Sequence, residues 1–348
     1  MEILPLYEMG GVAWARGDLE SARDWWVEGL ARSEQFNDET RLAWGYGGLG
    51  LLAMCKGQSA EARRKLEQAI EVCQRHGLME RLTVARINLV ELYHYTGNFR
   101  KGLQISDQAV TQAREVRYQY GVGLAMRYRT LVLTDIGRHS EAMENALASL
   151  RIHQDMGNRE EEMSSLVVAV RAGLAQGAFE EVEPMLETAV ELATNYDTEG
   201  FLPILLAWCA RVYAVTGRLD NACDALEKSM GAVGRPWPGQ RVRTNLNLAR
   251  ATLLLDARAE AMVFAEEALR LSDASGYRHY AMRARNLIMQ CTDDEVVIAR
   301  HHRVAEALAR SLAANLSRED ASAFLAMHGV TPRVTLAEKL GIPQPEGQ

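Results

Sequence analysis

Apolar residues along this chain recur at the spacing that places them on one face of an α-helix. Leu82, Ala85, Leu89 and Leu92 follow one another at intervals of three, four and three residues. This periodicity predicts an amphipathic helix that ends at Gly97, because glycine readily adopts the left-handed conformation that closes a helix. A polar residue and a second helical pattern follow Gly97, so the unit is predicted to be a helical hairpin.

The hairpin pattern repeats with a fixed period of 40 residues. Glycine occupies the helix-ending position in six consecutive blocks, at Gly17, Gly57, Gly97, Gly137, Gly177 and Gly217. The seventh block has Ala257 at this position. Small residues also recur in the second helix, as in Ala62 and Ala69, and allow the two helices of a hairpin to approach closely. A period of about 20–50 residues indicates a stack of one supersecondary unit.

The C-terminal part of the chain departs from this pattern. Residues 293–316 form an uninterrupted helical pattern, and Ser317 is a candidate N-cap for a short helix that ends at Met327. We therefore expect an array of about seven hairpins over residues 1–292, capping helices over residues 293–330 and a tail over residues 331–348.

Composition and charge narrow the function. The chain has 348 residues, of which 48% are hydrophobic and 7% aromatic, and its formal net charge is −7. A negative net charge argues against a nucleic-acid binder, which needs a basic surface. The five cysteines form no C-x-x-C pair and are expected to be buried side chains in a reducing compartment. No secretory signal pattern and no apolar run of about 18 residues is present, so we expect a cytoplasmic protein that does not bind membranes.

The repeat resembles the tetratricopeptide repeat. That family places small residues and a glycine at fixed positions, and the second block matches them with Gly50, Ala53, Gly57, Ala62, Leu66 and Ala69, with aliphatic residues in place of aromatic ones. The resemblance covers residues 1 to about 270 and implies an all-α fold, a right-handed α-solenoid of helical hairpins. The usual repeat has about 34 residues. Arrays with the longer period resemble those of bacterial signalling ATPases, kinases and transcription activators.

The resemblance also implies a binding surface. The first helices of tetratricopeptide hairpins line a concave groove, and the positions that face a ligand hold Tyr7, Trp14, Trp44, Leu51, Met54, Glu91, His94, Arg127, Arg171, Arg211 and Asn247. The first two blocks thus present an aromatic and apolar surface, whereas blocks four to six present one arginine each. We predict that Arg127, Arg171 and Arg211 together bind an acidic protein or peptide. The alternative is that each arginine pairs with a neighbouring acid, such as Asp135.

Two short motifs, a glycine-rich segment and a His–Glu pair, are interpreted as structural features and not as ligand sites. Residues 45–50 match G-x-G-x-x-G, but they lie inside a predicted helix rather than after a strand, so we interpret them as close-packing positions and not as a nucleotide site. His302 and Glu306 share a helix face, yet two ligands are too few for a zinc site. We therefore expect neither a metal nor a cofactor.

The sequence thus predicts a non-enzymatic scaffold that binds a peptide or partner domain in its concave groove. A regulatory sensor of a small ligand, with a closed pocket near Tyr7, Trp14 and Trp44, is the alternative. An enzyme would need titratable groups that converge from distant blocks, and the sequence pattern shows none. The apolar first hairpin also favours a homodimer.

Overall fold

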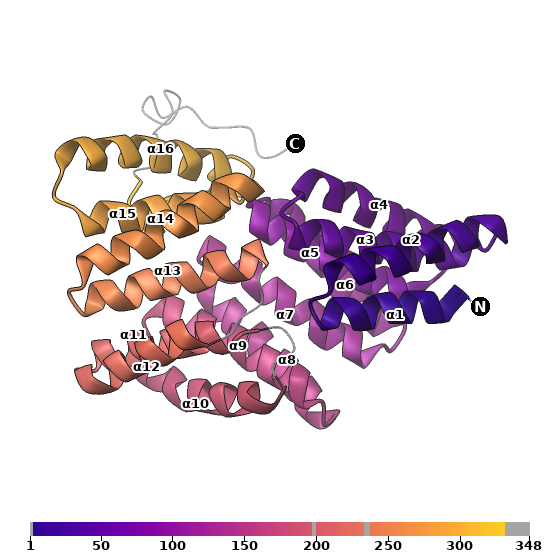
Figure 1. Ribbon diagram of the computed structural model, residues 1–348, viewed down its shortest axis with the longest axis horizontal. Helices are drawn as coiled ribbons and strands as arrows, with labels where there is room; N and C mark the ends of the chain where they lie inside the picture. Colours follow the sequence, from indigo (N-terminus) through magenta and orange to yellow (C-terminus); the bar gives the residue numbers. More distant parts are fainter. Residues whose placement is uncertain (1–2, 197–199, 233–236, 331–348) are drawn as a thin grey trace.

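The computed structural model describes residues 3–196, 200–232 and 237–330, and these ranges contain seventeen α-helices and no strand. The predicted tail over residues 331–348 lies outside the described residues. The helices form the right-handed α-solenoid that the sequence predicts (Figure 1).

The helices follow one another as hairpins with short turns. In chain order they are α1 (Ile3–Ala15), α2 (Leu19–Gln35), α3 (Glu39–Cys55), α4 (Ser59–Arg75), α5 (Met79–Thr96), α6 (Phe99–Glu115), α7 (Gln119–Ile136), α8 (His139–Asp155), α9 (Arg159–Gln176), α10 (Phe179–Tyr196), α11 (Leu202–Val215), α12 (Leu219–Gly231), α13 (Pro238–Leu254), α14 (Arg258–Ser275), α15 (Arg278–Cys291), α16 (Glu295–Ala313) and α17 (Arg318–Met327). Helices α16 and α17 occupy the range of the expected cap, and the Ser317 hydroxyl accepts the backbone N–H of Asp320 as an N-cap.

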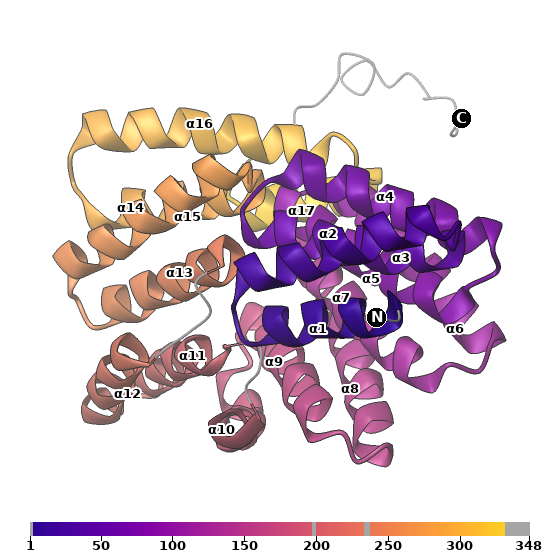
Figure 2. The same cartoon turned by 45° about the vertical axis from the view of Figure 1, so that its right-hand side comes forward.

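The odd-numbered helices α1 to α15 form the inner layer of the solenoid. Each of them packs against its hairpin partner and also against the first helix of a neighbouring hairpin, for example α5 against α7 and α11 against α13. Their side chains therefore face the inside of the superhelix, and the even-numbered helices from α2 to α16 lie outside them (Figure 2).

The two halves of the array meet, so the superhelix closes on itself. Helix α15 packs against α5, and α17 packs against α7. Near this contact the Ser59 hydroxyl donates a hydrogen bond to the Ser275 carbonyl oxygen at 3.0 Å. The rings of Trp14 and Trp237 stack with their centroids 4.9 Å apart. Helices far apart in the sequence thereby enclose one inner surface.

Left-handed residues end the first helices, as predicted. The six glycines from Gly17 to Gly217 that recur every 40 residues have φ between 70° and 91°. In the seventh block the left-handed residue is Asp256, with φ of 60°, and not the residue that aligns with the glycines, Ala257. The register of this block is therefore shifted by one residue relative to the others.

Three of the four glycines of α3 are close-packing positions, as the sequence analysis interpreted them, namely Gly45, Gly48 and Gly50; for Gly47 this interpretation is wrong. A Cβ atom added at Gly48 would lie 2.4 Å from Cδ2 of the buried Trp26, whereas one added at Gly47 would meet nothing within 4 Å. The G-x-G-x-x-G match therefore lies within a packed helix.

Replacing Gly48 with Ala is expected to destabilise the protein by about 1–3 kcal/mol, because Trp26 must move to admit the methyl group. Gly47→Ala, on the same helix, is the matched control and is expected to be neutral or stabilising by up to about 1 kcal/mol, because alanine favours the helix. Urea unfolding of the two variants measures both changes. Equal effects would contradict the close-packing interpretation.

Four of the five cysteines are wholly or partly buried, and all five are free thiols. Cys223 is exposed, so the prediction of burial is wrong for this residue. Its side chain lies on the outer helix α12, where the solenoid leaves a face open to solvent. Within the described residues, no helix combines the length and the apolarity needed to cross a membrane.

Candidate functional site

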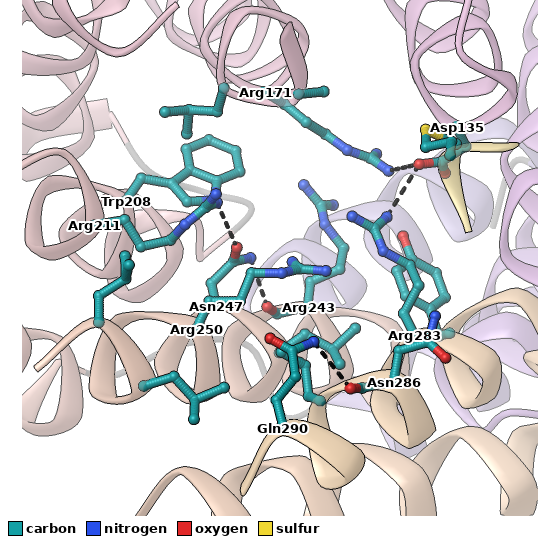
Figure 3. Close-up of a pocket in the computed structure, with 18 of the residues that line it drawn as sticks. Asp135, Arg171, Trp208, Arg211, Arg243, Asn247, Arg250, Arg283, Asn286 and Gln290 are labelled. Atoms are coloured by element: carbon teal, nitrogen blue, oxygen red, sulfur yellow. Dashed lines mark hydrogen bonds and ion pairs between the residues drawn. The ribbon is translucent and has the colours of Figure 1, made fainter. Parts of the chain in front are cut away.

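A cavity of about 700 Å³ opens on the inner surface of the solenoid. Its walls come from α7, α9, α11, α13 and α15, with His328 after α17 at one end. Five arginines from four of these helices converge on the space (Figure 3), which we call the arginine cavity; they are Arg171, Arg211, Arg243, Arg250 and Arg283. The volume lies within the usual range for ligand sites.

Three of these arginines are placed by the repeat itself. Arg171, Arg211 and Arg250 each lie six residues before the left-handed residue that follows their helix, which for Arg250 is Asp256. They therefore occupy equivalent positions on the consecutive inner helices α9, α11 and α13. Because equivalent positions of stacked hairpins face the same way, the three side chains form a row along the inner surface; we call it the arginine row.

Asp135 compensates part of the positive charge on one wall of the cavity. Its carboxylate, only 3% exposed, lies 2.6 Å from Nη2 of Arg171 and 3.1 Å from Nη1 of Arg283. Its Oδ2 also lies 2.7 Å from Nε2 of His94 and 3.6 Å from Nε2 of His279. Burial opposes ionisation, but the charge of Arg171 and the contacts with the two histidines outweigh it and hold the pKa of Asp135 well below its usual range.

The opposite wall has no such counter-ion. Within the part of the chain that the structure describes, Arg211 reaches only Oδ1 of Asn247, at 3.4 Å, and its buried Nε has no hydrogen-bond partner. Arg250 makes no hydrogen bond or ion pair with a described residue, and Arg243 lies over the ring of Phe201, 5.4 Å from the centroid. Three guanidinium groups are thus left without a carboxylate.

Burial and mutual repulsion weaken these charges. Burial lowers the pKa of Arg211 to about 10, and the nearby charge of Arg283 adds to the effect. Burial also lowers the pKa of Arg250 well below its usual value, with further lowering by Arg283, Arg211 and Arg171. Arginine side chains keep their proton in proteins at neutral pH, so an anion in the cavity would relieve the cost of holding these two charges there.

The balance of charge in the cavity is positive, although the protein as a whole is acidic. Among the described lining residues the only acids are Asp135, which is already paired, and the exposed Asp256 at the rim. Arg258 also lines the cavity, but it pairs with Asp293 at 3.2 Å. Trp208 and Leu246 add apolar surface. This combination fits a ligand with an anionic group and an apolar part, since guanidinium groups bind carboxylate and phosphate oxygens in pairs.

A second, smaller pocket of about 240 Å³ lies in the N-terminal half. Tyr7, Trp14, Trp44 and Leu51 line it, and the guanidinium carbon of Arg81 lies 3.2 Å from the centroid of the Trp44 ring. The sequence analysis placed an aromatic and apolar surface here. The pocket is far smaller than the arginine cavity and its lining is mostly apolar.

The structure divides the predicted binding residues into three groups. Arg171, Arg211 and Asn247 line the large cavity, and the four aromatic and apolar residues of the first two blocks named above line the small pocket. His94 is buried against Asp135. Met54 belongs to the core, and the half-buried Glu91 lines neither pocket.

Arg127 does not join the other two arginines of the predicted triad. It is buried, its Nη2 lies 3.4 Å from Oε2 of Glu161, and it lines neither pocket. For this residue, pairing with a neighbouring acid is what the structure shows. Arg171 also pairs with an acid, but it keeps a place on the cavity wall.

The sequence analysis missed Arg243, Arg250 and Arg283. Because the left-handed residue of the seventh block is Asp256, Arg250 is the equivalent of Arg211, whereas the unshifted register places Ala251 at this position. Asn247 was selected from a different position of the block. Counting back from an Asp at the end of the helix would have found Arg250. Arg283 belongs to α15, beyond the last repeat that the period defines, and no sequence signal marked it. No cluster of three or more potential metal ligands occurs within the described residues.

Stacked helical hairpins with an inner cavity define the class of this protein as a tetratricopeptide-type α-solenoid. The sequence matches the family described as the MalT-like TPR region over residues 45–313, which is more than half of the chain, so the chain belongs to that family. No curated protein has a detectably similar sequence.

Several solved structures share the fold. A Rap protein complexed with Competence and Sporulation Factor is 13% identical, with a TM-score of 0.62 over 86% of this chain and 83% of that one. NprR in complex with its cognate peptide NprX is also 13% identical, with a TM-score of 0.58 over 94% of this chain and 98% of that one. Aspartyl phosphate phosphatase F from Bacillus subtilis is 12% identical, with a TM-score of 0.54 and coverage of 96% and 97%.

Proposed function

We propose that this protein is an interaction module that binds a peptide, or an extended segment of a partner protein, inside its superhelix. The observation that carries the proposal is the cavity of about 700 Å³ on the inner surface, where three arginines lack a carboxylate. The excess positive charge favours an acidic segment, and Trp208 and Leu246 favour apolar side chains beside the acidic group. Stacked hairpins hold these groups in place before binding, which limits the ordering cost.

Two similar structures support a peptide as the ligand. The Rap protein was solved complexed with Competence and Sporulation Factor, and NprR was solved with its cognate peptide NprX. Both share the fold of this chain over most of its length. We propose by analogy that the ligand here is also a peptide or protein segment, that the role is in signalling and that the protein acts in the cytoplasm.

The test is selection from a display library of random peptides on the wild-type protein. We expect the selected peptides to be enriched in Asp and Glu. We expect the double variant Arg211→Glu/Arg250→Glu to bind a selected peptide more than tenfold more weakly in fluorescence anisotropy, because each lost charge-assisted contact costs about 1.5–3 kcal/mol. Arg151→Glu, on the outer helix α8, is the control for the added negative charge.

Two results would contradict the proposal. Selected peptides that bind the double variant as tightly as the wild type would exclude the cavity as the binding site. Failure to select any peptide, together with a thermal shift on addition of small metabolites, would favour the small-ligand sensor instead.

Homodimerisation through the first hairpin remains a further proposal. Met9 and Val12 on α1 and Val27 on α2 are exposed apolar side chains, which would be covered in a dimer. Sedimentation equilibrium at increasing concentration measures whether the mass doubles; a constant monomer mass would exclude it.

A further inference from the structure

We propose that the arginine cavity recognises a dianionic group, which is either a phosphoryl group or two adjacent carboxylates, through Arg211, Arg243 and Arg250. This inference rests on the proposed function and specifies the chemistry that a bound segment must carry. It follows from how the charges of the cavity are distributed between its two walls.

The first wall has little capacity for another anion. Arg171 and Arg283 contact the same oxygen of Asp135, at 2.6 Å and 3.1 Å. A ligand that paired with either arginine would have to compete with a buried carboxylate that is already in place. Figure 3 shows both guanidinium groups turned toward Asp135. This wall therefore acts as a fixed boundary of the site.

The second wall holds the charge that a ligand can neutralise. Arg211, Arg243 and Arg250 extend from α11 and α13 into the cavity and lack a carboxylate among the described residues (Figure 3). The exposed Asp256 at the rim offers at most one negative charge. About two positive charges thus remain on this wall. A single carboxylate would leave one of them, whereas a phosphoryl group, with a charge of about −1.5 to −2, would neutralise both.

The shape of the donors also favours a group with several oxygens. Three planar guanidinium groups from two adjacent helices offer more N–H donors than one carboxylate can accept, since each guanidinium has five N–H groups. The buried Nε of Arg211 has no acceptor among the described residues. A phosphoryl group offers three oxygens and a pair of carboxylates offers four, so either can serve all three arginines at once.

Such a site should cost the ligand-free protein stability. Burial is the largest cost of holding the Arg250 charge, and repulsion by the charges of Arg283, Arg211 and Arg171 adds to it. Removing the Arg250 charge should therefore raise the melting temperature of the ligand-free protein while it weakens anion binding. A merely structural arginine would show the reverse, because its loss would lower the melting temperature.

The experiment uses the full chain and simple anions as probes. Sulfate, inorganic phosphate and succinate are compared with acetate and chloride by isothermal titration calorimetry at pH 7.5 and low salt. We expect the dianions to bind at one site per chain and at least tenfold more tightly than acetate. Sulfate and succinate distinguish the tetrahedral group from the paired carboxylates.

Variants locate the site. Arg250→Gln is expected to weaken binding of the preferred dianion at least tenfold and to raise the ligand-free melting temperature. Arg151→Gln is the matched control, because Arg151 is exposed on the outer helix α8 and lines neither pocket, and it should leave the affinity unchanged. Equal affinity for acetate and the dianions would overturn the proposal. Equal effects of the two variants would also overturn it.

The peptide selection and the dianion titrations together show whether the dianion site, the peptide function or both are correct. If selected peptides bind the cavity but neither sulfate nor succinate competes with them, the dianion site is wrong and the peptide function stands. If a dianion binds and depends on Arg250 but no peptide is selected, the dianion site stands and the peptide function is wrong. Where both hold, a phosphoserine peptide compared with a Glu-Glu peptide of the same length decides which source of the dianion is preferred.

Discussion

Replacing Asp135 with Asn is expected to lower the free energy of unfolding by about 3–5 kcal/mol, because it removes the only described carboxylate between Arg171, which is largely buried, and the half-buried Arg283. The amide keeps the size of the side chain but not its charge. Arg171 is 10% exposed and cannot turn fully to water, so its charge would remain in the interior without a partner. The contact with His94 would also lose its charged acceptor. The site joins α5, α7, α9 and α15, so the closure of the superhelix should loosen as well.

Urea unfolding at pH 7 measures this change, and Asp107→Asn is the matched control. Asp107 also forms an ion pair with an arginine, Arg129, at 2.7 Å, but its side chain is 58% exposed. Exposed pairs contribute about 0–1 kcal/mol. If the two variants lose the same stability, Asp135 is not the buried counter-ion that the structure indicates.

The fold could be predicted from the sequence because the features that specify each hairpin are local and recur along the chain. Each hairpin depends on a helical apolar pattern and on one left-handed residue, and both occur within 40 residues. Six glycines at a constant spacing were therefore enough to predict the architecture. Asp256 shows the limit of the pattern, because an aspartate can also adopt the left-handed conformation and its place shifted the register by one residue.

The candidate site was only partly predictable because it depends on how far the superhelix turns. Arg171 and Arg211 followed from their equivalent positions in the repeat. Asp135 and Arg283, in contrast, are 148 residues apart and meet only because the C-terminal hairpins come round to α5 and α7. Small rotations between hairpins add up to this closure, and no local pattern specifies their sum.

Arg127 shows why position in a repeat does not settle the role of a charged residue. It occupies a position that was expected to face a ligand, yet it pairs with Glu161 on the next inner helix, α9. Arg211 and Arg250, the later members of the arginine row, stay available to a ligand because no described acid comparable to Glu161 lies beside them. The neighbouring residues, and not the position alone, decide whether an arginine remains available to a ligand.

The stability of the protein is expected to fall steeply as the pH is lowered from about 6.5 toward 4. Burial lowers the pKa of His94 to about 4, although Asp135 opposes the shift, and burial with the charge of Arg283 lowers the pKa of His328 to about 4. Burial also lowers the pKa of His279 well below its usual value. In the unfolded chain these side chains titrate near 6.5.

The sign of the effect follows from proton binding. Between pH 6.5 and 4 the unfolded chain binds more protons at these histidines than the folded protein does, so acidification favours unfolding. At pH 5 each histidine with a folded pKa of about 4 removes about 2 kcal/mol relative to pH 8, so His94 and His328 together remove about 4 kcal/mol. Asp135 affects stability in a lower pH interval than the histidines, because its stabilising charge is lost only when the pH falls below about 4.

Urea unfolding of the wild type and of His328→Asn at pH 8 and pH 5 tests the histidine account. The variant cannot take up a proton at this position, so it should lose about 2 kcal/mol less than the wild type between the two pH values. If the free energy of unfolding differs between the variant and the wild type by the same amount at both pH values, His328 matters only for packing against Phe324.

Because His328 and His279 both line the arginine cavity, protonation in acid would add positive charge there. The same acidification that destabilises the ligand-free protein should therefore increase the stabilisation that a bound anion provides.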